Sequence, residues 1–157
     1  MNVITAPDND PRRGKMSIFL AGTIDDSHSI DWQKELCERL SESKLTGGLT
    51  IFNPRRSQWN SEISSEELKV QINWELSHLE EADWIIMNIL GSSKSPISLL
   101  ELGLFARTGK LKVFCPEEYF RSTNVEVTCE HYHVCLIKTN DIDKIVNTIK
   151  ELTILQT

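Results

Sequence analysis

The sequence of this 157-residue chain predicts an α/β protein: a doubly wound, flavodoxin- or Rossmann-like five-stranded parallel sheet with helices on both faces. Two observations predict this fold. Short apolar runs alternate along the chain with longer segments of helical periodicity. The apolar runs are continuous rather than alternately apolar and polar, which is typical of parallel strands covered on both faces. Such folds bind ligands at the carboxyl ends of their strands, so the residues after each strand are the first candidates for a site.

The expected elements lie in a single domain at residues 16–157. The strands are expected at residues 17–21, 49–52, 83–88, 111–115 and 133–138, and the helices at 31–40, 66–81, 95–106 and 142–152. Residues 1–15 are polar and unpatterned, which predicts a flexible N-terminal arm. Residues 117–130 show no clear periodicity and are expected to be irregular. Two helices should bury apolar stripes, at Leu68, Ile72, Leu76 and Leu79 and at Ile142, Ile145, Val146, Ile149 and Leu152.

The composition excludes several classes of protein. The net charge of −6 argues against a nucleic-acid backbone as the main partner. No apolar run approaches the ~20 residues of a membrane span, and the first residues lack the apolar core of a signal peptide, so a cytoplasmic protein without a membrane partner is expected. His131 and His133 lie near two cysteines but fit no common zinc spacing, so no metal site is expected. The cysteines form no Cys-x-x-Cys pair and are expected to be reduced and structural: Cys37, Cys115, Cys129 and Cys135.

Glu101 is the first candidate for a catalytic residue. It is a lone carboxylate in an apolar helix that begins at Ser95-Pro96, where serine can cap free N–H groups and proline already has a helical φ. That helix is apolar on nearly all sides and is expected to be buried. A carboxylate there is costly to bury, so it should face a group that compensates for the loss of water. The alternative is a capping box, in which Glu101 bonds back to the N–H of Ser98.

Residues suited to a small anionic ligand follow the first two expected strands. Gly22-Thr-Ile-Asp25 supplies backbone N–H groups, a hydroxyl and a carboxylate. Asn53-Pro-Arg-Arg56 supplies two guanidinium groups, which fit phosphate or carboxylate, with surface salt bridges as the alternative role. The chain has neither a Gly-x-Gly-x-x-Gly dinucleotide fingerprint nor a Gly-x-x-x-x-Gly-Lys phosphate loop.

A polar and aromatic stripe lies beside the leucine stripe of the helix at 66–81. A solvated face is the ordinary interpretation of such a stripe. Trp74 favours a ligand site instead, because an exposed tryptophan is uncommon and its ring can stack on a nucleobase. Glu75 and Glu101 would then approach one pocket, where one carboxylate attacks a sugar carbon and the other positions a hydroxyl or handles the proton. The stripe has spacings of three and four and consists of Glu67, Gln71, Trp74, Glu75 and His78.

An ordered set of short motifs runs through residues 17–126. The motifs are Ile18-Phe-Leu-Ala-Gly-Thr-Ile24, Trp32, Phe52-Asn-Pro-Arg-Arg56, Gln71-x-x-Trp-Glu75, Leu79, Ala82-Asp83 and Ser98-Leu-Leu-Glu-Leu-Gly103. Each motif is weak alone, but together and in this order they resemble the nucleoside 2-deoxyribosyltransferase family. The resemblance is closest to the second, less studied branch of that family, which also has the Asn-Pro-Arg-Arg and Gln-x-x-Trp-Glu stretches.

The resemblance implies a chemistry and a set of residues. It implies that Glu101 attacks the anomeric carbon of a nucleoside and displaces the base, and that Glu75 lies near the sugar. It also implies a homo-oligomer with shared active sites, in which Asn124 is donated across the subunit interface. The candidate substrate-binding residues, from the resemblance and the stretches above, are Gly22, Thr23, Ile24, Asp25, Asn53, Arg55, Gln71, Trp74, Ser95, Ser98 and Asn124.

Departures from the family pattern leave the reaction open between transfer and hydrolysis, and the substrate open between nucleoside and nucleotide. Ser95 stands where transferases often have an aspartate, whereas related hydrolases of deoxynucleoside 5′-monophosphates have a serine there that contacts phosphate. Those hydrolases, however, carry an arginine where this chain has Asp25 and a tyrosine where it has Phe19.

The expected function is cleavage or transfer of the N-glycosidic bond of a (deoxy)nucleoside or nucleotide. No metal or organic cofactor is expected, because the carboxylate and the departing base carry out the chemistry. The alternatives are a nucleotide N-glycosidase, acting on a deoxynucleoside monophosphate or a nicotinamide nucleotide, and a non-catalytic nucleotide-binding or assembly protein with the same fold.

Overall fold

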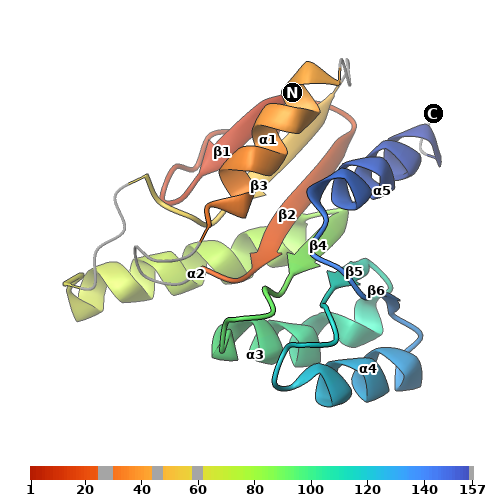
Figure 1. Ribbon diagram of the computed structural model, residues 1–157. Helices are drawn as coiled ribbons and strands as arrows, with labels where there is room; N and C mark the ends of the chain where they lie inside the picture. The colour runs from red at the N-terminus through yellow and green to blue at the C-terminus, as the bar shows by residue number, and fades with distance from the viewer. Residues whose placement is uncertain (25–29, 44–47, 58–61, 156–157) are drawn as a thin grey trace.

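A computed structural model describes residues 1–24, 30–43, 48–57 and 62–155 of the chain. These residues form a parallel sheet of order β1-β3-β2-β4-β5-β6, covered by helices on both faces (Figure 1). The strands are β1 (Asn2–Thr5), β2 (Met16–Gly22), β3 (Leu49–Asn53), β4 (Trp84–Asn88), β5 (Leu111–Phe114) and β6 (Cys135–Ile137). The helices are α1 (Trp32–Glu42), α2 (Ser65–Glu81), α3 (Pro96–Phe105), the short 3-10 helix η1 (Ala106–Thr108), α4 (Ser122–His131) and α5 (Ile142–Leu155).

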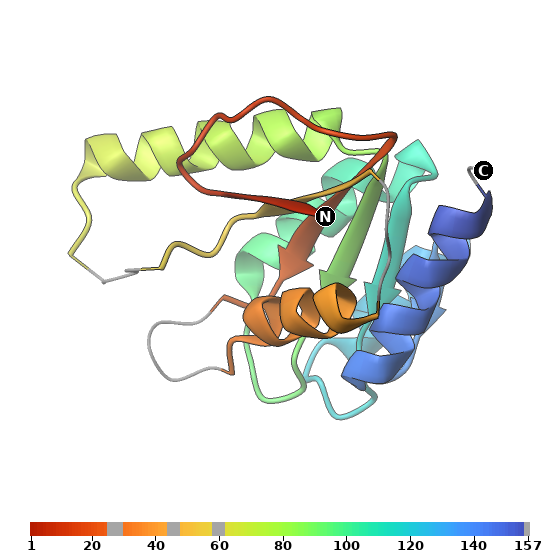
Figure 2. The ribbon, with the colours of Figure 1, turned by 90° about the horizontal axis from the view of Figure 1, so that it is seen from above.

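The layers confirm the fold class that the sequence predicts. Helices α1 and α5 pack on one face of the sheet and α2, α3 and α4 on the other, which divides the buried apolar side chains into two clusters (Figures 1 and 2). Strands β3-β2-β4-β5-β6 have the flavodoxin-like order, with the reversal of winding between β2 and β4. Ligand sites of such folds lie at this reversal, at the carboxyl ends of the strands.

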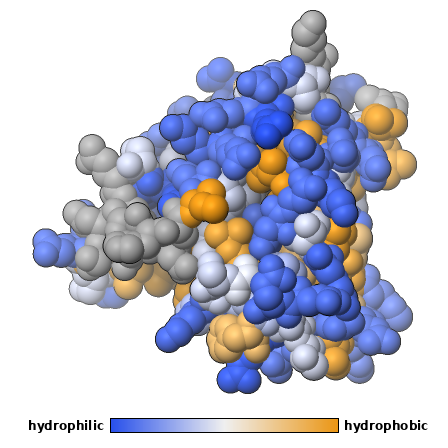
Figure 3. All heavy atoms as spheres, viewed as in Figure 1, coloured by the Kyte–Doolittle hydropathy of each residue, from blue (hydrophilic) through white to orange (hydrophobic). Residues whose placement is uncertain are grey.

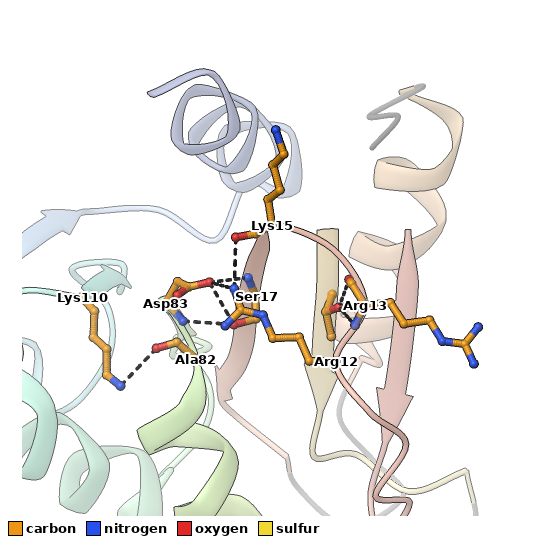
Figure 4. Close-up of polar contacts among 8 residues, drawn as sticks. Arg12, Arg13, Lys15, Ser17, Ala82, Asp83 and Lys110 are labelled. Atoms are coloured by element: carbon orange, nitrogen blue, oxygen red, sulfur yellow. Dashed lines mark hydrogen bonds and ion pairs between the residues drawn. The ribbon is translucent and has the colours of Figure 1, made fainter. Parts of the chain in front are cut away.

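The sheet has six strands rather than the predicted five. The additional strand, β1, lies within the segment expected to be a flexible arm, and it pairs with β3 from Asn2↔Thr50 to Thr5↔Asn53. The rest of this segment is held by further contacts (Figure 4). Arg12 forms an ion pair with Asp83, and the backbone N–H of Arg13 donates to the Thr50 hydroxyl at 3.1 Å. Pairing with β3 satisfies backbone groups that β3 would leave open as an edge strand, and it buries Ile4. A four-residue strand is too short for its sequence to show this pairing.

The structure corrects the predicted orientation of α2. Its apolar stripe points outward, with Leu68, Ile72 and Leu76 between 40% and 44% exposed, and Leu79 alone of the four is buried. The inward stripe consists of Gln71, Trp74, His78 and Leu79. Its polar atoms have hydrogen-bond partners, so they can be buried without a large desolvation penalty.

Helices α3 and α4 also differ from expectation. Helix α3 is not buried on all sides, because Ile97, Leu100 and Leu104 are 53–59% exposed. Helix α4 begins within the segment 117–130 that was expected to be irregular, and it buries Val125 and Cys129. The spacing of four between these two residues is helical, but two positions are too few to show a period. Figure 3 shows the hydrophilic surface interrupted by several hydrophobic patches.

Candidate active site

A cavity of about 500 Å³ lies between α2 and α3 at the carboxyl end of β2. Its volume is in the range of small-molecule sites. Strand β2 forms the floor, the segment after β3 contributes one side, and the two helices form the remaining walls. The lining residues are Phe19, Ala21, Gly22, Ile24, Pro54, Leu68, Gln71, Ile72, Glu75, Leu76, Ser95, Pro96, Ile97, Ser98, Leu100, Glu101 and Leu104.

Two carboxylates share this cavity, as the sequence predicts. Glu101 comes from the second turn of α3 and is 8% exposed, and Glu75 comes from the middle of α2 and is partly buried. They are the charged side chains among the lining residues. Burial, followed by the negative charge of Glu75, raises the pKa of Glu101 to about 8. Both effects favour the protonated form of Glu101.

Glu75 has a different electrostatic environment from Glu101. Burial raises the pKa of Glu75, whereas a hydrogen bond from Gln71 and the positive charge of Arg56 act in the opposite direction. The bond runs from Gln71 Nε2 to Glu75 Oε1 at 2.8 Å. No described residue donates a hydrogen bond to the Glu101 carboxylate. The environments of the two carboxylates thus favour the negative charge on Glu75 and the proton on Glu101.

The capping interpretation of Glu101 is wrong, because α3 begins before Ser98. The N-cap of α3 is Ser95, with Pro96 at the first helical position, so Ser98 lies inside the helix and lines the cavity. Ser95 does not cap the helix with its side chain, contrary to expectation. Its hydroxyl instead lies 2.7 Å from that of Thr23. The backbone of Ser95 is left-handed, with a φ of 46°.

Ser95, Thr23 and Ser93 form a buried cluster of hydroxyls beside the cavity. Their oxygens lie 2.7–2.9 Å from one another, and Thr23 Oγ1 also accepts from the backbone N–H of Leu90 at 2.9 Å. The neighbouring Gly22 has a φ of 122°, and a Cβ there would lie 2.1 Å from the Asn88 carbonyl oxygen. Glycine is therefore required where the ends of β2 and β4 meet.

Several candidate residues do not line this cavity. Trp74 is buried in the core, where its ring stacks on His78 at 4.1 Å and its Nε1 donates to the Asp8 carbonyl at 2.7 Å. Asn53 and Arg55 line a more open depression of about 880 Å³ between α1 and the edge of the sheet. Asn124 is exposed on α4, and Asp25 lies outside the described residues.

The predicted residues that do meet in the cavity come from distant parts of the chain. They are Gly22, Ile24, Gln71, Glu75, Ser95, Ser98 and Glu101, with Thr23 directly behind Ser95.

Sequence reasoning missed the apolar part of the lining. Leu68, Ile72 and Leu76 of α2 face Ile97, Leu100 and Leu104 of α3 across the cavity mouth. Both helices carry more apolar side chains than one inward stripe can hold, and this excess could have indicated a second apolar surface.

The described residues contain no group of three or more His, Cys, Asp or Glu side chains that could hold a metal ion. No helix in the described part of the chain is long and apolar enough to cross a bilayer.

The fold and the cavity define an α/β protein with a pair of carboxylates at the reversal of strand order. The chain belongs to the family described as nucleoside 2-deoxyribosyltransferase like, which it matches over residues 15–119. This segment contains Gly22, Glu75 and Glu101 and ends before α4, which carries Asn124. A comparison with curated proteins finds no match.

Proposed function

We propose that the protein cleaves or transfers the N-glycosidic bond of a (deoxy)nucleoside or nucleotide, with Glu101 as the nucleophile. The observation that carries the proposal is the buried Glu101 beside Glu75 in one cavity, in a chain of the deoxyribosyltransferase-like family. A carboxylate pair that flanks a sugar is the arrangement used to break glycosidic bonds.

In the first step, an ionised oxygen of Glu101 attacks C1′ of the sugar. The C1′–N bond breaks, its electrons go to the base, and the sugar becomes an ester of Glu101. The base leaves as a neutral molecule and so takes up a proton, which matches the proton that Glu101 must release before it attacks. In the second step, a nitrogen of another base or a water oxygen attacks C1′ and frees the Glu101 carboxylate. Glu75 orients a sugar hydroxyl or accepts the proton of the incoming group. These steps need no metal or organic cofactor.

A nucleotide substrate is the alternative favoured by a specific observation. Ser95 lines the cavity at the N-terminus of α3, and its hydroxyl belongs to the cluster with Thr23 and Ser93. Hydroxyls and free N–H groups at a helix N-terminus suit a phosphate. A 5′-phosphate at this end would make the protein a nucleotide N-glycosidase, acting on a deoxynucleoside monophosphate or a nicotinamide nucleotide. A non-catalytic nucleotide-binding protein would use the same cavity without turnover.

The test is incubation of the wild type with nucleosides and their 5′-monophosphates, each with and without a second free base, followed by chromatography of released bases. Glu101→Gln should lower the rate by several orders of magnitude, as expected when a covalent nucleophile is lost. Glu151→Gln, an exposed glutamate of α5, is the control and should leave the rate unchanged. Normal turnover by Glu101→Gln would refute the proposed role, and binding without any released base would favour the non-catalytic alternative.

We also propose that the active unit is a homo-oligomer in which Asn124 completes the cavity of a neighbouring subunit. Six half-exposed apolar side chains surround the cavity mouth, a surface that association would remove from water: Leu68, Ile72, Leu76, Ile97, Leu100 and Leu104. Mixing inactive Glu101→Gln and Asn124→Ala subunits should restore part of the activity, because some cavities then combine both wild-type residues. No recovery in subunits shown to have exchanged would place each site within one chain.

A further inference from the structure

Arg56 lies outside the cavity but is connected to it through one side chain. It follows β3, and its Nε donates to Gln71 Oε1 at 2.6 Å. Gln71 lies on α2 and is 1% exposed. Its Nε2 donates to Glu75 Oε1 at 2.8 Å and to the Pro54 carbonyl at 2.9 Å. A continuous chain of hydrogen bonds therefore runs from Arg56 through Gln71 to Glu75.

The order of donors and acceptors fixes how the Gln71 amide is oriented. A guanidinium can only donate, so it holds the amide oxygen of Gln71 toward Arg56. The amide nitrogen then faces Glu75 and Pro54, and its two N–H groups match these two acceptors. Reversing the amide would set N–H groups against Arg56 and an oxygen against Glu75. Because Gln71 is buried, water has little access to compensate for such a reversal.

These hydrogen bonds give the two carboxylates of the cavity different electrostatic environments. Glu75 receives the Gln71 hydrogen bond and lies in the field of Arg56, whereas Glu101 has burial and the negative charge of Glu75 against its ionised form. Strand β2, which forms the floor, contributes Phe19, Ala21 and Gly22 and no charge. Among the residues that the structure describes, Arg56 lowers the pKa of Glu75 by its positive charge, and the negative charge of Glu75 raises the pKa of Glu101.

We propose that Arg56 is a positioning residue that acts through Gln71 to fix the orientation of the Glu75 carboxylate in the cavity. The catalytic consequence rests on the proposed function, whereas the effect on the carboxylates is a property of the free protein. The ordinary alternative is that these hydrogen bonds only hold the segment after β3 against α2. That alternative predicts a change in stability but no change in the titration of the carboxylates.

The first test therefore uses no substrate. The titrations of the Glu75 and Glu101 carboxyl carbons are followed by NMR in the free protein, for the wild type, Gln71→Leu, Arg56→Ala and Arg56→Lys. Gln71→Leu removes the donor at nearly constant volume and should raise the pKa of Glu75. The pKa of Glu101 should fall, because its neighbour carries less charge. Arg56→Ala should change both in the same directions, and Arg56→Lys, which keeps the positive charge, should give a smaller change.

The second test is the pH dependence of kcat/KM for the reaction found with the wild type. Misplacement of Glu75 should lower kcat/KM about 10- to 100-fold and shift the pH profile, with kcat affected more than KM. Asn73→Leu, on the exposed side of α2, and Arg13→Ala, an exposed arginine, are the matched controls and should leave both titrations and rates unchanged.

Unchanged titrations in folded Gln71→Leu and Arg56→Ala would overturn the proposal, as would equal changes in the controls. If Gln71→Leu does not fold, the two Arg56 variants decide the matter, since Arg56 is only partly buried. If the wild type releases no base from any substrate, the proposed function fails. The titrations still decide the role of Arg56 in that case.

Discussion

Helices α5 and α2 pack on opposite faces of the same sheet and differ in which side chains they turn toward it. On α5 the apolar stripe is inward, and Ile145, Val146, Ile149 and Leu152 are buried as their spacing predicts. On α2 three apolar side chains, Leu68, Ile72 and Leu76, point outward, while the inward stripe consists of Gln71, Trp74, His78 and Leu79. The face covered by α5 is an ordinary core. The face covered by α2 contains the cavity.

The difference shows that burial depends on partners as well as on hydrophobicity. Each inward polar side chain of α2 has a hydrogen-bond partner: Trp74 Nε1 donates to the Asp8 carbonyl, and His78 Nδ1 lies 2.8 Å from the Trp74 carbonyl. The acceptor for Trp74 belongs to the N-terminal segment, which runs alongside α2 (Figure 2). The apolar side chains that α2 turns outward line the mouth of a cavity instead of the core.

A large effect on stability is expected when Trp74 is truncated, and this substitution tests whether the inward stripe of α2 belongs to the core. Trp74→Ala should lower the free energy of unfolding by about 3–5 kcal/mol, as for other large-to-small changes at buried aromatic residues. Binding per folded molecule should stay near the wild-type value, because Trp74 does not line the cavity. Urea denaturation and ligand titration measure the two quantities. If the variant has normal stability but no longer binds ligand, Trp74 belongs to the ligand site and not to the core.

The next prediction concerns how the buried carboxyl group of Glu101 makes the stability of the protein depend on pH. The folded-state pKa of Glu101, about 8, lies above its ordinary value of 4.5, so the unfolded chain releases this proton first as the pH rises. The folded protein therefore loses stability between these two pH values. Glu101→Gln removes this loss, so its stability relative to the wild type should increase by about 4–5 kcal/mol between pH 4 and pH 9. Denaturation curves across this range test the prediction, with Glu151→Gln as control. A constant difference at every pH would contradict it.

The smallest effect is expected at Ile72 of α2, which is compared with the matched isoleucine Ile149 of α5. Ile149→Ala on α5 should cost about 2–4 kcal/mol, because Ile149 is fully buried. Ile72→Ala on α2 should cost less than about 1 kcal/mol at low protein concentration, because its side chain is half-exposed. Urea denaturation of both variants at micromolar concentration makes the comparison. Equal losses would mean that Ile72 is as much core as Ile149, and the contrast between the two faces would be wrong.

The sequence by itself determined the class of fold, the flavodoxin-like order of five strands and the two carboxylates of the cavity. Continuous apolar runs between helical segments leave few alternatives to a parallel sheet covered on both faces. Glu101 was evident because it is a charge within an apolar helix, and such local contrast is visible in a linear chain. Family resemblance favoured a catalytic role for Glu101 over a capping box, and it indicated Glu75 as the second carboxylate near the sugar.

Only the tertiary structure decided which face of α2 points inward, which residues pair with β3, and how Arg56 reaches Glu75. These features depend on partners far away in the sequence: Asp8 for Trp74, Thr50 for Asn2, and Gln71 for Arg56. Periodicity reports that a helix has two unlike faces but not which of them will find hydrogen-bond acceptors when the chain folds. The free energy of burying a polar group is set by those acceptors, and their positions exist only in three dimensions.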